Sequence, residues 1–239
     1  MPTMKVAVIT PYFCEERQLL LTCIDSVREQ TYPCTHILVA DGEPQPWLTQ
    51  HSVQHLKLDT NHADYGDTPR GIGSLSAIRQ GFDAVAYLDA DNWYSSDHIT
   101  TLVSLHRETG AAVCTSRRNL HRLDGSLLGP CSDVDGEKFT DTNCLMLTKA
   151  AFGAVSAWMS IPAEFHCVGD RIMWSHILNH GFSRVHSGQA TVAYRTAFKF
   201  HYRRFGETPP PGSKTGAAIS NAIKRLQILD LSRRRWNEP

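Results

Sequence analysis

Short apolar segments alternate with amphipathic segments in the first half of the chain, and this alternation constrains the fold most. Buried strands are predicted at residues 5–10, 36–40, 84–89 and 111–115, with a weaker strand at 54–58. Apolar residues at helical spacing, such as Leu20, Ile24 and Val27, predict a helix over 15–29. Further helices are predicted over 73–82 and after Ser95 or Ser96. The pattern indicates an α/β fold with a mainly parallel sheet and helices on both faces.

The pattern changes after about residue 116. Residues 119–140 predict a hairpin or an irregular segment, and strands are predicted at 144–148 and 183–194. Helices are predicted at 168–179 and, with a basic end, at 216–236. For 239 residues we expect one domain made of two parts, 1–115 and 116–239.

Composition excludes some classes of protein. The formal net charge is zero, so nothing indicates a nucleic-acid partner. No run approaches 18 apolar residues, so neither a transmembrane helix nor a signal peptide is expected. The seven cysteines form no C-x-x-C pair, which favours reduced thiols in a cytoplasmic protein: Cys14, Cys23, Cys34, Cys114, Cys131, Cys144 and Cys167.

Two acidic residues, Asp89 and Asp91, terminate the predicted strand at 84–89. In an extended chain Asp89 and Asp91 point to the same side, at the carboxyl edge where open α/β sheets bind ligands. Paired carboxylates there suit a hard divalent cation, Mg²⁺ or Mn²⁺, that also binds phosphate oxygens. The alternative is a solvated loop with two acidic residues, because such short matches are common.

Two other strand ends are expected at the same edge, Thr10-Pro11 and Asp41-Gly42. A carboxylate at position 41 would accept the ring N–H of uracil or guanine. The alternative is that Asp41 and Gly42 form only a turn, in which both residue types are favoured.

The order of these segments resembles that of the family 2 glycosyltransferases, which have a GT-A fold with a Rossmann-like sheet. The similar stretches are VAVITPYFCEERQLLLTCIDSVREQTY at 6–32, HILVADGE at 36–43 and AYLDADN at 86–92. The resemblance implies that 1–115 binds the nucleotide-sugar, with Thr10 and Pro11 beside it. Asp41 would contact the base, Asp89 the ribose or metal, and Asp91 the metal. Residues 116–239 would then form the acceptor side.

A second acidic segment, VGDRIMW at 168–174, is similar to one in which the family usually has Glu-Asp before an apolar helix. Gly169 stands where the Glu is usual, whereas Asp170 keeps the position of the general base of inverting members. The alternative is that Asp170 only caps the helix. Glu164 is the next candidate base.

Three further features are considered. Arg70, in a predicted loop over 59–72, is expected to pair with the diphosphate, or else to be a solvated loop residue. His201 is a candidate third metal ligand, although a lone His is more often an ordinary polar residue. The basic segment 233–236 suits the end of a helix, and a peripheral contact with the inner membrane face is left open.

The resemblance therefore implies a glycosyltransferase dependent on Mn²⁺ or Mg²⁺, with inversion of the anomeric centre. Its donor would be a nucleoside-diphosphate sugar, UDP-linked in preference to GDP-linked. The acceptor, whether a glycan, a lipid-linked compound or a small molecule, is not identified by the sequence. Two other functions stay open: a sugar nucleotidyltransferase, and a non-catalytic nucleotide-sugar-binding module of the same fold.

Overall fold

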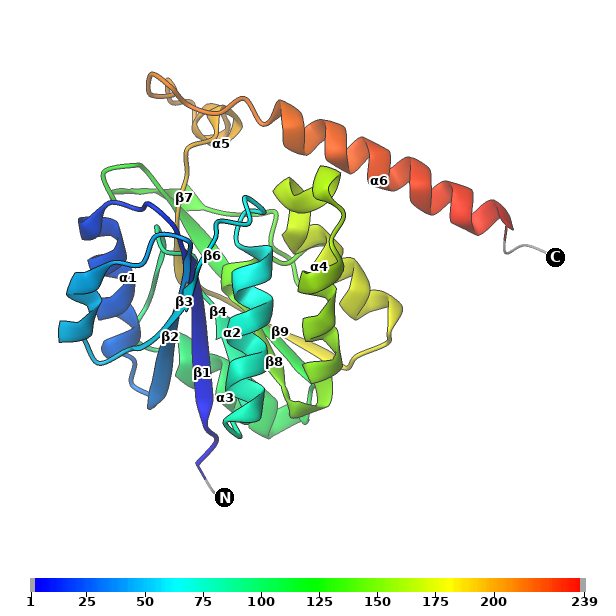
Figure 1. Ribbon diagram of the computed structural model, residues 1–239. Helices are drawn as coiled ribbons and strands as arrows, with labels where there is room; N and C mark the ends of the chain where they lie inside the picture. The colour runs from blue at the N-terminus through cyan, green and yellow to red at the C-terminus, as the bar shows by residue number, and fades with distance from the viewer. Residues whose placement is uncertain (1–2, 237–239) are drawn as a thin grey trace.

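The computed structural model describes residues 3–236, with side chains up to Leu229, and these residues form a nine-stranded sheet flanked by helices (Figure 1). The strands are β1 Val6–Tyr12, β2 Cys34–Asp41, β3 Gln54–Leu58, β4 Ala84–Tyr87, β5 Trp93–Tyr94, β6 Val113–His121, β7 Leu127–Pro130, β8 Leu145–Thr148 and β9 Arg184–Arg195. The helices are α1 Arg17–Arg28, α2 Asp67–Arg79, α3 His98–Thr109, α4 Gly169–Asn179, α5 Lys199–Arg204 and α6 Ala217–Trp236. Four 3₁₀ helices complete the description: η1 Pro46–Gln50, η2 Thr142–Cys144, η3 Lys149–Ser160 and η4 Ala163–Val168.

The sheet has the strand order β3-β2-β1-β4-β8-β6-β9-β5, and β7 pairs with β6. The first four strands are parallel, as predicted, so the carboxyl ends of β1, β2 and β4 meet at one edge. The second half is mixed, because β8 lies between β4 and β6 and is antiparallel to both. The predicted α/β fold with helices on both faces is thus confirmed, and strands from both parts of the chain share one sheet.

Helices cover the two faces of this sheet with separate apolar cores. On one face α2, η3 and α4 pack on the sheet around Trp158 and Tyr87, both fully buried. On the other face α1 and α3 pack around Leu102 and Cys23. The start of α6 packs on η4 through Ala222, and Figure 1 shows the rest of α6 extending past the body of the domain.

The prediction of a loop over 59–72 is wrong in its second half, because α2 begins at Asp67. The side chain of Asp64 accepts the backbone N–H of Thr68 at 2.8 Å, which stabilises the first turn. Two glycines, Gly71 and Gly73, lie inside the helix. A Cβ at Gly73 would come within 2.6 Å of Ile9, so glycine lets α2 pack directly on β1.

In the described part of the chain no helix is both long and apolar enough to cross a membrane.

Candidate active site

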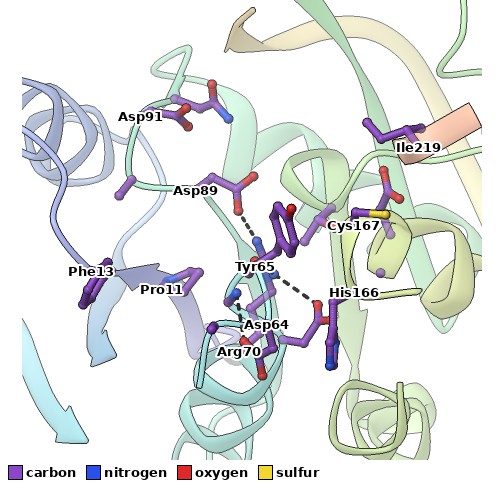
Figure 2. Close-up of a pocket in the computed structure, with 18 of the residues that line it drawn as sticks. Pro11, Phe13, Asp64, Tyr65, Arg70, Asp89, Asp91, His166, Cys167 and Ile219 are labelled. Atoms are coloured by element: carbon purple, nitrogen blue, oxygen red, sulfur yellow. Dashed lines mark hydrogen bonds and ion pairs between the residues drawn. The ribbon is translucent and has the colours of Figure 1, made fainter. Parts of the chain in front are cut away.

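A cavity of about 940 Å³ opens at the carboxyl edge of the parallel strands (Figure 2). Six of the site residues predicted from the sequence line it: Pro11, Asp41, Arg70, Asp89, Asp91 and Asp170. Strand ends bring the first part of the chain to this cavity, and the start of α4 brings Asp170.

Asp89 and Asp91 lie in a turn and not at the end of an extended strand. Strand β4 ends at Tyr87, and the N–H of Asn92 donates to the carbonyl oxygen of Asp89 at 3.0 Å. The prediction that strand alternation places the two carboxylates on one side is therefore wrong in its reason. Both residues nevertheless line the same cavity.

Asp89 is held on both carboxylate oxygens. Nη2 of Arg70 donates to Oδ1 of Asp89 at 2.5 Å. Nδ2 of Asn143 donates to Oδ2 at 2.9 Å, and Oδ1 of Asn143 accepts the backbone N–H of Asp89 at 2.6 Å. The side chain of Asn143 is fully buried and also donates to Asp141, which is ion-paired with Arg118. Asn143 therefore orients Asp89.

Asp91 lies in a different environment from Asp89. Burial raises its pKa to about 7, and the neighbouring carboxylates of Asp89 and Glu15 add to the effect. Burial also raises the pKa of Glu15, which lines the same cavity. Three carboxylates near one another repel, and a divalent cation would relieve that repulsion.

The carboxylates in this part of the cavity fit a metal ion whose coordination is completed by oxygen atoms of the substrate. Among the side chains that the structure describes, which end at Leu229, no three His, Cys, Asp or Glu residues are arranged to hold an ion by themselves. Mg²⁺ characteristically uses one or two carboxylates together with substrate phosphates. Asp91, together with Asp89, supplies that number of ligands, so the residues present fit such an ion.

Arg70 lies in the first turn of α2 and is buried. Besides Asp89, its Nη1 atom donates to the carbonyl oxygen of Tyr65 at 2.9 Å and lies 3.5 Å from Oδ1 of Asp67. Nε of Arg70 is buried without a hydrogen-bond partner. The alternative of a solvated loop residue is wrong, because α2 holds the guanidinium group against the cavity.

Asp41 is buried at the end of β2 and accepts hydrogen bonds from one residue, His62. The backbone N–H of His62 donates to both carboxylate oxygens at 3.2 Å, and Nδ1 of His62 lies 2.6 Å from Oδ1. Pro11 lines the cavity nearby, whereas Thr10 does not: its hydroxyl lies in the sheet, 2.8 Å from Nε2 of His36.

Asp170 is the second residue of α4. Burial raises its pKa to about 6, and the charge of Asp141 adds to the effect. Its Oδ1 atom accepts the N–H of Arg171 at 2.7 Å, but the N-cap position belongs to Val168. The carboxylate is therefore not a conventional cap. Glu164 lies outside the cavity lining and is ion-paired with Arg225 of α6 at 3.5 Å.

His201 is not brought to the carboxylates. It is buried in α5, its Nδ1 atom lies 2.6 Å from the hydroxyl of Thr196, and burial lowers its pKa to about 4. It does not line the cavity. This placement corresponds to the alternative of an ordinary buried histidine.

Several residues at the site have no signal in the sequence. Asp67, 1% exposed, lies 2.8 Å from Nδ1 of His166, 99 positions later in the chain. Asn143 reaches Asp89 across 54 positions. Glu15 lies within the stretch that resembles the family, but no pattern marked its role. Such contacts depend on the fold, so only the three-dimensional arrangement identifies them.

Comparison with known proteins identifies solved structures that share this fold. The chain is similar in structure to residues 1–349 of S. aureus TarS, with a TM-score of 0.59 and 14% identity over 80% of this chain and 60% of that one. The UDP complex gives 0.57 and 13% over 84% and 63%, and the UDP-GlcNAc complex 0.59 and 13% over 81% and 59%. The chain thus spans less than two thirds of these structures.

The fold is therefore the GT-A fold that the resemblance implied. A comparison with curated protein sequences gives no match. Residues 7–153, more than half of the chain, match the profile described as Glycosyl transferase family 2. The chain belongs to glycosyl transferase family 2.

Proposed function

We propose that the protein is a metal-dependent, inverting glycosyltransferase that moves a sugar from a UDP-sugar to the hydroxyl group of an acceptor. One observation carries the proposal: Asp89 and Asp91 share a cavity with Asp170, which comes from a different element. Family membership supports transfer of a sugar, and the UDP and UDP-GlcNAc complexes of TarS support uridine over guanosine.

The donor would lie along the carboxyl edge of the sheet. Asp41, oriented by His62, is suited to accept the ring N–H of the base, and Pro11 lies beside it. Arg70 is positioned by Asp89 and would bind the diphosphate, as guanidinium groups commonly do.

Asp91 and Asp89 would hold Mn²⁺ or Mg²⁺. When bound, the ion would neutralise the charge that develops on the leaving diphosphate. Burial and the charges of Asp89 and Glu15 raise the pKa of Asp91, which favours a role for its carboxylate toward a cation.

Asp170 would act on the acceptor. The acceptor oxygen forms a bond to the anomeric carbon as the bond from that carbon to the diphosphate oxygen breaks, through a transition state resembling an oxocarbenium ion. The acceptor's proton passes to the carboxylate of Asp170, and UDP leaves. A pKa of about 6 keeps Asp170 mostly ionised at neutral pH, yet basic enough to take a proton.

Two other functions are weighed against this one. A sugar nucleotidyltransferase would need a glycine-rich, basic loop after the first strand, whereas the loop after β1 carries Glu15 and Glu16. A non-catalytic binding module would bind UDP with metal in the same way but would not act on the donor. A carboxylate with a raised pKa in the same cavity, that of Asp170, favours the enzyme over such a module.

An assay of the slow hydrolysis of UDP-GlcNAc, UDP-glucose and UDP-galactose with Mn²⁺ distinguishes the transferase from the binding module. We expect UDP to be released from at least one donor, and the release to stop with chelator or in Asp91→Ala. Binding of UDP with Mn²⁺ but no hydrolysis and no transfer would favour the binding module. Absence of metal-dependent UDP binding would refute the proposal.

The C-terminal helix adds a proposed location. Helix α6 exposes Ile228 and Leu229 beyond the part that packs on η4, and the basic segment 233–236 follows, although its side chains lie outside those described. An apolar and basic helix end would bind an anionic membrane surface peripherally. Sedimentation with anionic vesicles, compared between the full chain and a chain ending at 229, would test this.

A further inference from the structure

The loop between β3 and α2 holds two non-glycine residues in the left-handed region of backbone space. Ala63 has φ 52° and Tyr65 has φ 58°, followed by Gly66 at 85°. A bulky side chain is rarely found in this conformation, because its Cβ is crowded by the backbone. Such residues persist only where the surroundings fix them, and they concentrate at ligand sites.

The backbone around Tyr65 is fixed from both sides. The carbonyl oxygen of Tyr65 accepts from Nη1 of Arg70 at 2.9 Å. The carboxylate of Asp64 accepts the N–H groups of Gly66 at 3.1 Å and Thr68 at 2.8 Å. Gly66 packs on Pro11, where an added Cβ would lie 2.9 Å from the proline ring. Together these contacts place Tyr65 in one position.

The side chain of Tyr65, in contrast, is mostly exposed to solvent. The residue is 70% exposed, the highest value among the exposed large hydrophobic residues of the described chain, and it lines the cavity. Packing therefore does not explain why a bulky aromatic residue occupies a strained position. Its ring is available to a ligand.

The place of Tyr65 in the cavity indicates which part of the ligand it meets. In Figure 2 Pro11 and Phe13 lie on one side of Tyr65, and Cys167 and Ile219 lie on the other. Under the proposed function the nucleotide would lie on the first side, where Pro11 lines the cavity. The acceptor would lie on the second side, because Asp170 lines the same cavity and belongs to the segment that directly follows Cys167. The sugar that is transferred has to lie between the diphosphate and Asp170.

We propose that Tyr65 is a specificity-determining residue whose ring stacks on the pyranose of the donor. This inference rests on the proposed function. The face of an aromatic ring is apolar and carries partial negative charge, so it suits the C–H face of a sugar. Arg70 links the two parts of the donor site, because it positions both Asp89 and the backbone of Tyr65.

The test compares binding of UDP with binding of UDP-GlcNAc, UDP-glucose and UDP-galactose, all with Mn²⁺, by calorimetry. Tyr65→Asn removes the ring and retains a residue type that tolerates a positive φ. We expect it to weaken the best-bound nucleotide-sugar by about 3- to 10-fold, the scale of an aromatic contact. UDP affinity should change less than about twofold on the same scale. The matched control is Tyr65→Phe, which keeps the ring and should bind every ligand as the wild type does.

Thermal unfolding supplies a second measurement that does not need a ligand. Tyr65→Asn should unfold at the same temperature as the wild type or higher, because the strain is relieved and little packing is lost. A lower unfolding temperature would identify the ring as a packing group and overturn the proposal. Unchanged affinity for the nucleotide-sugars, or an equal loss for UDP, would also overturn it. Failure of the wild type to bind UDP with Mn²⁺ would instead refute the proposed function.

Discussion

The carboxylate of Asp67 occupies the space into which a side chain at Gly169 would project. A Cβ at Gly169 would lie 2.5 Å from Oδ1 of Asp67. The carboxylate cannot easily move away, because Asp67 is 1% exposed and is paired with His166 and Arg70. This accounts for glycine at a position where the related segment usually has Glu. It also joins α2, which carries Arg70, to the segment that carries Asp170.

Gly169→Ala should therefore destabilise the fold. The backbone at Gly169, φ −55° and ψ −35°, suits alanine, and helix propensity alone would favour alanine by up to about 1 kcal/mol. Overpacking against Asp67 opposes this gain, and we expect a net loss of about 1–2 kcal/mol in the free energy of unfolding, measured in urea.

Gly153→Ala is the matched control, since a Cβ there meets nothing within 4 Å. It should be neutral. In an Asp67→Ala background, Gly169→Ala should no longer cost stability. A loss of the same size in both backgrounds would show that Asp67 is not the obstacle.

Asp91 should make stability depend on pH. Its pKa is about 7 in the folded protein against 3.8 for the ordinary carboxyl group, so the folded state retains a proton that the unfolded chain releases. The contribution of Asp91 to the free energy of unfolding is therefore most favourable below about pH 4, and it is lost as the pH rises to about 7. Asp91→Asn should thus raise the free energy of unfolding by about 1–3 kcal/mol at pH 8 and leave it unchanged below pH 4.

The same residue should make Mn²⁺ binding depend on pH. A carboxylate ligand has to be deprotonated, so Mn²⁺ with UDP should raise the unfolding temperature more at pH 8 than at pH 6. Asp91→Asn should lose most of this increase. Asp97→Asn, at an exposed carboxylate in the turn before α3, should behave as the wild type does. An increase in Asp91→Asn equal to that of the wild type would exclude Asp91 as a ligand.

Asn143 should be needed to hold Asp89. Asn143→Ala leaves the N–H of Asp89 and the carboxylate of Asp141 each without one partner, at a cost of about 1–3 kcal/mol in the free energy of unfolding. Metal-dependent UDP binding should weaken as well, because Asp89 loses its orientation. Asn179→Ala, at an exposed asparagine on α4, is the control. Loss of stability with unchanged UDP affinity would limit Asn143 to a structural role.

The sequence predicted those parts of the fold and site that depend on local pattern. Asp41 ends a strand, Asp89 and Asp91 follow one, and Asp170 lies in the first turn of a helix, so their places at the sheet edge follow from chain direction. The position of β8 between β4 and β6 did not follow, because the order of strands along the chain does not determine their order in the sheet.

The start of α2 was missed for a different reason. Glycine is favoured in turns, but Gly71 and Gly73 allow close packing instead. A Cβ at Gly71 would lie 2.3 Å from Met159, and a Cβ at Gly73 would lie 2.6 Å from Ile9. Glycine has both roles, and only the neighbours in space distinguish them. The partners His62 and His166 were missed because they reach Asp41 and Asp67 across 21 and 99 positions.

Asp170→Asn should separate transfer from donor binding. Asn keeps the size of Asp170 and can still accept the N–H of Arg171, so the fold should persist. It cannot take a proton, and we expect transfer, or hydrolysis of the donor as its substitute, to fall by about 10²–10⁴. Affinity for UDP with Mn²⁺ should stay near that of the wild type, because the donor carboxylates are on other elements. The wild-type rate at saturating donor should rise through about pH 6 as Asp170 ionises. Glu164→Gln, at the ion pair with Arg225 outside the cavity lining, is the control and should keep the wild-type rate. If Asp170→Asn works at the wild-type rate while Glu164→Gln is impaired, the base is Glu164 and α6 takes part in its positioning.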